Sequence, residues 1–177
     1  ERFAFSTRGG ILYFLRAPTA NGRKGGALMA LDLYATDPGE DSPKPLLLLE
    51  QGASLANLQV GLAGKIYLEK RGAGKNQRTL LEFDTKTMKV VELPIKEKLW
   101  SLFSGADVAA PQVLLLERKG KDVTVRVRSI TLKKQQVLGT VKNAPEDLVP
   151  LALASDGRSA LLSAADDKGA AVIVVRL

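Results

Sequence analysis

The stretch LALASDGRSALLS at residues 151–163 holds two apolar runs with an Asp-Gly pair between them. The runs Leu151–Ala154 and Ser159–Ala164 have the length of strands and are too short for typical helices. Asp156-Gly157 indicates a tight turn, because glycine tolerates the positive φ that hairpin turns require. We therefore predict two antiparallel strands joined at this turn.

Short apolar runs bounded by turn residues continue along all 177 residues of the chain. Helical spacing of apolar residues is weak, and the best helix candidates are the short segments Ser54–Leu62 and Lys96–Phe103. The pattern therefore predicts an all-β chain. The expected strands are residues 2–6, 11–16, 27–34, 46–50, 58–62, 65–70, 78–84, 88–93, 102–106, 113–118, 123–132, 136–141, 151–154, 159–164 and 171–177.

The expected strands fall into four units with the same order of strands and turns. When the first turns are aligned on Gly10, Gly64, Pro111 and Gly157, the offsets are 54, 47 and 46 residues. A repeat of about 45 residues with four strands is typical of a β-propeller blade. We predict one propeller-type domain or propeller segment, with blades at about residues 1–53, 54–98, 99–147 and 148–177. A β-sandwich uses similar strands and is the alternative.

The apolar pattern also predicts where individual strands lie within a blade. Val123, Val125 and Val127 alternate with polar residues, as in a strand near the outer rim with one solvated face. The runs Val113–Leu116 and Ile11–Leu15 are apolar on both faces, which favours strands held between neighbouring blades.

The Ser155-Asp156-Gly157-Arg158 turn resembles the S-x-D-G-[KR]-x-[apolar] blade motif of TolB-type propellers and of the N-terminal propellers of tricorn-like proteases. The segment Leu81–Thr87 is similar, through Asp84 and Thr87, to the D-x-x-T part of the L-x-x-x-D-x-x-T ending of third strands in such blades. Unit one keeps the Ser and Gly of the first motif but lacks its Asp. The resemblance implies a propeller fold and, because members are commonly extracytoplasmic protein-binding scaffolds, a periplasmic or extracellular location, with a cytoplasmic location as the alternative.

Composition excludes several kinds of chemistry. The sequence has no His and no Cys, so Ser–His–Asp triads, Cys–His pairs and thiolate zinc sites are impossible. The acidic loops, which include Asp37, Glu40 and Asp41, lack the ligand spacing of a calcium loop. No apolar run approaches the roughly 18 residues of a membrane span. We expect no metal, no cofactor and no catalytic residues.

The net charge of +7 is concentrated in the middle of the chain. Residues 51–150 carry seventeen Lys/Arg and ten Asp/Glu, whereas the charges balance on both sides of this segment. Much of the excess lies in turns between second and third strands, which emerge on one face of a propeller. Such a face attracts phosphate, acidic polysaccharide or an acidic protein surface, although the same residues also serve as ordinary solubilising turn residues. The candidate anion- or partner-binding residues are Arg23, Lys24, Lys70, Arg71, Lys75, Arg118, Lys119 and Lys121.

These observations predict a non-catalytic propeller scaffold for protein–protein interaction, possibly as a subunit or module of a larger assembly. The alternatives are a propeller segment of a tricorn-like protease, an anion-binding module with a basic rim, and a propeller enzyme that uses Asp, Lys or Tyr.

The last unit has three expected strands, ending at 171–177, where the other units have four. We therefore expect residues outside this numbering, a protein partner or a second copy of the chain to complete the last blade, and we consider sequence-specific nucleic-acid binding unlikely because exposed aromatics are few.

Overall fold

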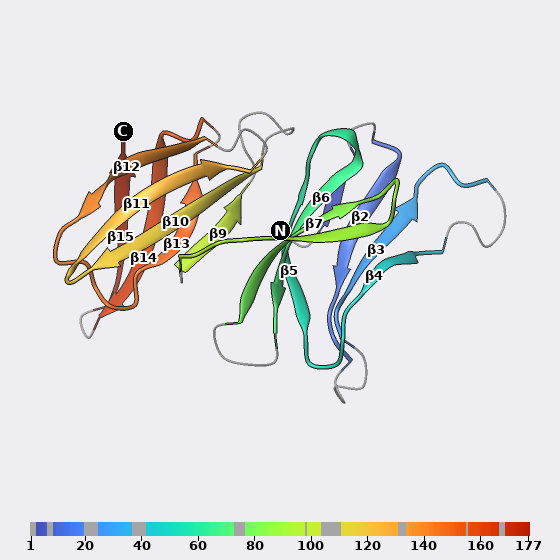
Figure 1. The fold of residues 1–177 in the computed structure, drawn as a ribbon, viewed down its shortest axis with the longest axis horizontal. Coiled ribbons are helices and arrows are strands. Elements are labelled where there is room, and N and C mark those ends of the chain that lie inside the picture. The colour runs from blue at the N-terminus through green and yellow to red at the C-terminus, as the bar shows by residue number, and fades with distance from the viewer. Residues whose placement is uncertain are drawn as a thin grey trace. The chain divides into compact units, whose positions relative to one another are not determined.

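The structure, a computed structural model, describes residues 3–6, 9–19, 25–36, 42–72, 77–97, 99–103, 111–130, 134–154, 156–166 and 169–177. These residues form four antiparallel sheets, and in each sheet neighbouring strands follow one another in the chain (Figure 1). One sheet lies in each of the four predicted blade ranges. The sheets are β1 (Phe3–Phe5), β2 (Ile11–Arg16), β3 (Ala27–Asp32) and β4 (Lys44–Leu48); β5 (Ser54–Val60), β6 (Lys65–Arg71), β7 (Arg78–Asp84) and β8 (Lys89–Leu93); β9 (Leu99–Phe103), β10 (Gln112–Lys119), β11 (Asp122–Ser129) and β12 (Gln135–Val141); and β13 (Val149–Leu153), β14 (Ser159–Asp166) and β15 (Gly169–Arg176).

The two segments with the strongest helical spacing are not helices, and they contain the strands β5 and β9. In β5 the register shifts between Ala56 and Gln59, and Asn57 has a φ of 50°. The bulge brings Leu55 and Leu58, three residues apart, into the same core, which gives the segment its helix-like spacing. The only helical element among the described residues is a 3-10 turn at Leu62–Gly64, and no described helix is long and apolar enough to cross a membrane.

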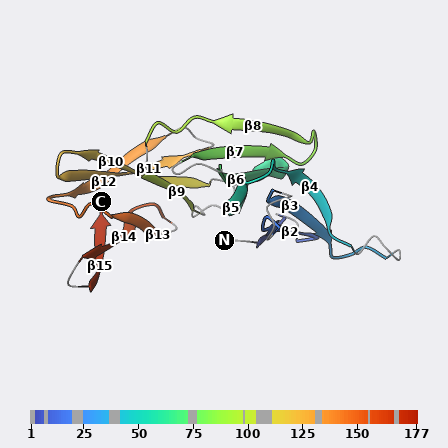
Figure 2. The same ribbon diagram turned by 90° about the horizontal axis from the view of Figure 1, so that it is seen from below.

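The chain divides into two compact units, Glu1–Ile95 and Lys96–Leu177, each with two sheets. In the first unit, one face of each sheet contributes to a shared core. Tyr13 and Leu28 come from the first sheet, whereas Leu58, Ile66 and Phe83 come from the second. Figure 2 shows β8, β7, β6 and β5 following one another across the second sheet, in agreement with their pairing.

The core of the second unit is built in the same way. Val123, Val125 and Val127 of β11 point into it, as their alternation predicts, and they pack with Ala160 and Leu162 of the last sheet. The run Val113–Leu116 is buried at all four positions, so both faces of β10 are covered. The alternation predicted for β11 and the burial predicted for both faces of Val113–Leu116 are confirmed. The same prediction is wrong for Ile11–Leu15, where only Tyr13 is buried, because Leu12 and Phe14 lie on the face opposite the core.

The predicted turns are present where the structure describes them. Gly157 has a φ of 70°, and the Asp156 carboxylate accepts a hydrogen bond from the Arg158 N–H at 2.8 Å. Gly64 takes the same backbone conformation in the second sheet. In the first sheet Gly9, not Gly10, is the residue with positive φ. Glycine is needed at these places because side chains strain this conformation.

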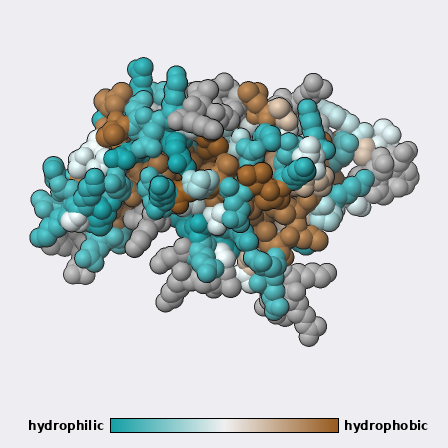
Figure 3. Space-filling model, in the orientation of Figure 1, coloured by the Kyte–Doolittle hydropathy of each residue, from teal (hydrophilic) through white to brown (hydrophobic). Residues whose placement is uncertain are grey.

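The first and last sheets each have an exposed apolar face. On β1, Phe3 and Phe5 pair with Phe14 and Leu12 on the face opposite the core, and Phe3 is 62% exposed. On the last sheet, Val172 is 61% exposed and Val174 is 49% exposed. Hydrophobic surface is visible among hydrophilic side chains in Figure 3.

Strand β15 is at the edge of the three-stranded last sheet. It pairs with β14 from Ser159↔Arg176 to Asp166↔Gly169, and no described strand pairs with its other side. The three strands expected in the last unit are therefore present, and what completes this sheet stays a prediction.

Candidate functional site

A buried carboxylate lies on the second sheet. Glu69 of β6 has a fully buried side chain. Its Oε1 atom accepts hydrogen bonds from Nε of Arg71 at 2.8 Å and from Nε of Arg78 at 2.9 Å, and its Oε2 atom accepts one from Nδ2 of Asn57 at 2.8 Å. Both carboxylate oxygens are therefore satisfied, as a buried charge requires.

Local strand geometry brings these four residues together. Glu69 and Arg71 are two residues apart on β6 and so share a face, and Arg71 is directly opposite Arg78 in the β6–β7 pairing. Asn57 reaches the same carboxylate from the bulge in β5, where its positive φ suits asparagine better than most residues. The bulge and the hairpin thus assemble the cluster.

The two guanidinium groups keep Glu69 ionised. Burial by itself raises the pKa of this carboxyl, but hydrogen bonds from Arg78 and Arg71, together with their charges, outweigh burial and hold the pKa below its usual value. The cluster of one carboxylate and two arginines therefore carries a net charge of +1. Arg71 remains 54% exposed, so its outer N–H groups face solvent while Nε is fixed.

A cavity of about 430 Å³ lies beside this cluster, within the first unit. Arg16 and Arg71 provide its charged groups, and the main-chain segment Ser54–Asn57 provides much of one wall. Volumes of this size are in the range of small-molecule sites. The lining residues are Leu15, Arg16, Ala17, Pro18, Ser54, Leu55, Ala56, Asn57 and Arg71.

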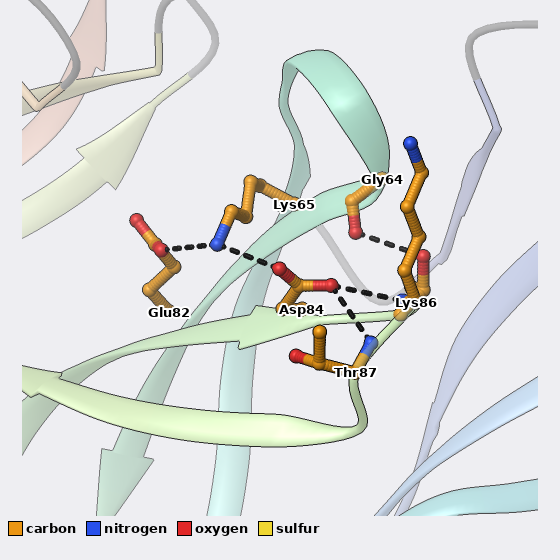
Figure 4. Close-up of polar contacts among 7 residues, drawn as sticks. Gly64, Lys65, Glu82, Asp84, Lys86 and Thr87 are labelled. Carbon is orange, nitrogen blue, oxygen red and sulfur yellow. Dashed lines mark hydrogen bonds and ion pairs between the residues drawn. The ribbon is translucent and has the colours of Figure 1, made fainter.

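A second polar cluster lies on β6 and β7, next to the turn that follows β7 (Figure 4). Nζ of Lys65 is 2.9 Å from Oε1 of Glu82 and 2.9 Å from Oδ2 of Asp84. The other Asp84 oxygen accepts the main-chain N–H groups of Lys86 at 2.9 Å and Thr87 at 3.1 Å. This is the D-x-x-T turn that the sequence predicts, and its aspartate closes the turn.

In this second cluster, the shifted pKa values keep Lys65 protonated and Asp84 ionised. The hydrogen bonds that Lys65 donates to Asp84 and Glu82 raise the pKa of Lys65. The hydrogen bond from Lys65 and those from the Thr87 and Lys86 main chain lower the pKa of Asp84 to about 2. Burial and the adjacent Glu82 raise the pKa of Tyr67 to about 12. A general acid or base works best with a pKa near the operating pH, so these groups suit structural ion pairing better than proton transfer.

Three of the eight predicted binding residues, Arg23, Lys24 and Lys75, lie outside the described residues. Two of the others belong to the first unit, where Lys70 pairs with Glu50 at 2.8 Å and Arg71 lines the cavity. The remaining three, Arg118, Lys119 and Lys121, lie at the β10–β11 hairpin. The clustering of all of these residues on one face stays a prediction.

At the β10–β11 hairpin, Arg118 and Lys119 make hydrogen bonds and an ion pair within the second unit. The Arg118 guanidinium donates hydrogen bonds to the main-chain oxygens of Ala144 and Pro145, and so fastens the segment after β12 to the hairpin. Lys119 pairs with Glu117 at 3.3 Å but is 75% exposed. Lys121 and Arg118 border a hollow of about 430 Å³.

The sequence reasoning did not select Arg16, Asn57 or Glu69. One signal was available for Glu69, because it directly follows the apolar run Ile66–Leu68 and is the only acidic residue of the expected strand 65–70. No sequence pattern connects Arg16 to Arg71, which are 55 positions apart. Among the described residues, no group of three or more Asp or Glu side chains could hold a metal ion.

No protein-family model matches the sequence, and no curated protein matches it by sequence. The structure is similar to TolB from Acinetobacter baumannii, with a TM-score of 0.59 and 13% identity over 100% of this chain and 43% of that chain. It is also similar to the β-propeller domain of the Trilobed protease from Pyrococcus furiosus, with a TM-score of 0.54 and 16% identity over 99% of this chain and 55% of that one.

A further similar structure is a prolyl endopeptidase, with a TM-score of 0.58 and 13% identity, of which this chain covers 28%. The chain therefore spans between about a quarter and about half of the length of these three proteins. The fold is that of a β-propeller, and the predicted resemblance to TolB-type and protease propellers is confirmed for the fold.

Proposed function

We propose that this chain is a non-catalytic β-propeller module that binds other proteins through its last sheet. The observation that carries the proposal is the exposed apolar face of the last sheet, which bears Val172 and Val174 on β15. Such a face gains from burial against an apolar surface of another protein.

A second copy of the chain is the partner that we propose. The outward face of the first sheet carries the large side chains Phe3 and Phe5, whereas the outward face of the last sheet carries the smaller Val172 and Val174. Inside the two units, sheet faces of this kind pack against each other, with large side chains against small ones such as Ala160. A head-to-tail contact of the first sheet on the last sheet of another copy would repeat this packing.

The similar structures support the proposal of a propeller module, because they share its fold. The chain shares its fold with TolB and with the propellers of two peptidases, one of which is described as having an open velcro topology. The composition also supports a non-catalytic role, because a sequence without His or Cys lacks the residues of the common nucleophilic mechanisms. A role as a propeller segment of a tricorn-like protease is the second candidate, and it rests on the same fold.

Sedimentation velocity over a range of chain concentrations tests the proposal. We expect the unaltered chain to associate, and Val172→Lys with Val174→Lys to remain monomeric, since two buried ammonium groups oppose the contact. The matched control is Val90→Lys with Val91→Lys on β8, which are also exposed valines on a strand at a sheet edge. A chain that stays monomeric up to about 100 µM, or equal association by both double variants, would contradict the proposed contact.

A further inference from the structure

The arginines at the cavity beside Glu69 carry positive charge that the ion pairs of the first unit do not neutralise. Glu69 neutralises one of its two arginine partners, and Arg16 adds another positive charge at the end of β2. Arg16 has no ion-pair partner among the described residues, and none of the described residues that line the cavity is acidic. The cavity is therefore an electropositive hollow with a net charge of about +2 around it.

Glu69 also fixes the orientation of the Arg71 guanidinium group. The carboxylate holds Nε of Arg71 at 2.8 Å, which leaves the two terminal nitrogens to donate elsewhere. A guanidinium fixed in this way matches the two oxygens of a carboxylate, with less side-chain entropy to lose on binding than a free arginine. The strands β2 and β5, which carry Arg16 and the Ser54–Asn57 wall, are neighbours in the first unit (Figure 1).

Apart from the two arginines, the cavity wall combines apolar side chains with the polar residues Ser54 and Asn57. Leu15, Pro18 and Leu55 lie around the two arginines, together with two alanines. A small inorganic anion would use the guanidinium groups but would leave these side chains in water. A carboxylate attached to an aliphatic group would use both, because the apolar part gains from burial while the charge is paired.

We propose that this cavity is a binding site for an organic carboxylate with an aliphatic body, held by Arg71 and Arg16 and packed on Leu15 and Leu55. The carboxylate has two possible sources, a free carboxylic acid and the carboxyl terminus of an extended peptide. The residues that line the site are different from Phe3, Phe5, Val172 and Val174, which carry the proposed contact between copies.

Isothermal titration calorimetry of the whole chain tests this site, with hexanoate as the first probe and hexanamide and inorganic phosphate as comparisons. We expect saturable binding of hexanoate, no measurable binding of hexanamide, and binding of phosphate at least tenfold weaker than that of hexanoate. A second pair of probes, acetyl-Ala-Leu with a free carboxylate and its carboxamide, distinguishes the sources. Tenfold or tighter binding of the free dipeptide relative to hexanoate assigns the site to peptide termini, and a smaller difference assigns it to free acids.

Variants show whether the binding belongs to this cavity. Arg16→Gln should weaken hexanoate binding at least tenfold without disturbing Glu69, whereas Arg71→Gln should do the same but with some loss of stability. Lys119→Gln, which removes an exposed cation in the second unit, is the control and should leave binding unchanged. Equal binding of hexanoate and hexanamide, binding of phosphate as tight as that of hexanoate, or unchanged hexanoate affinity in Arg16→Gln would overturn the proposal.

Discussion

Replacing Arg78 with Leu should destabilise the first unit at neutral pH through Glu69. Breaking a buried ion pair by removal of one partner costs about 3–5 kcal/mol, because a buried charge is left unpaired. Here Glu69 keeps two donors, Arg71 and Asn57, so the expected loss is nearer the value of one hydrogen bond to a charged group, about 2–3 kcal/mol. The measurement is urea unfolding followed by far-ultraviolet circular dichroism at pH 7.

The pH dependence gives a second and sharper readout. Because the folded pKa of Glu69 is lowered, its contribution to stability is fully present above the pKa of an unfolded glutamate, about 4.3, and is lost as the pH falls through the folded pKa. Arg78→Leu raises the folded pKa, so the difference between the variant and the unaltered chain should be full at pH 7 and should shrink below about pH 4.

Two further variants separate this mechanism from a general packing effect. Glu69→Leu combined with Arg78→Leu should recover part of the loss, since no buried charge remains to be paired. Lys44→Leu, which removes an exposed cation of β4 in the same unit, should change stability by less than about 0.5 kcal/mol. The reasoning would be refuted by an Arg78→Leu loss below about 0.5 kcal/mol at pH 7, or by a loss of the same size at pH 3.

Three other predictions concern single positions. Gly25→Ala should destabilise the first unit by more than about 2 kcal/mol, because its Cβ would overlap the main-chain oxygens of Leu49 and Glu50, and thermal unfolding should show this against the milder Gly10→Ala, whose Cβ meets only the Tyr34 ring. Val125→Ala should cost the second unit about 2–3 kcal/mol by leaving a cavity in its core, and a loss below about 1 kcal/mol in urea unfolding would contradict the assigned burial. In a spectrophotometric titration, the latest tyrosine to ionise, near pH 12, should disappear in Tyr67→Phe; an unchanged curve would show that Tyr67 is not the late group.

The strands were predictable because their signal is local. Apolar runs of strand length, a Gly or Asp-Gly turn after the first strand and an Asp-x-x-Thr turn after the third are present in the sequence itself. The limit of this reasoning is visible at Ser54–Leu62, where the bulge at Asn57 changes the spacing of Leu55 and Leu58 and imitates a helix. A bulge depends on the partner strand, so its position is not readable from one strand alone.

The sequence by itself determined the all-β class and the order of strands and turns in the four units, because these follow from chain order and side-chain alternation. Only the tertiary structure decided which charges meet. Strand register placed Arg71 opposite Arg78 beside Glu69, and the packing of the first two sheets brought Arg16 to the same cavity. The basic turn residues were visible as composition, but the pairing of Lys70 with Glu50 and of Arg118 with a main-chain oxygen joins segments distant in the chain, which a sequence pattern does not contain.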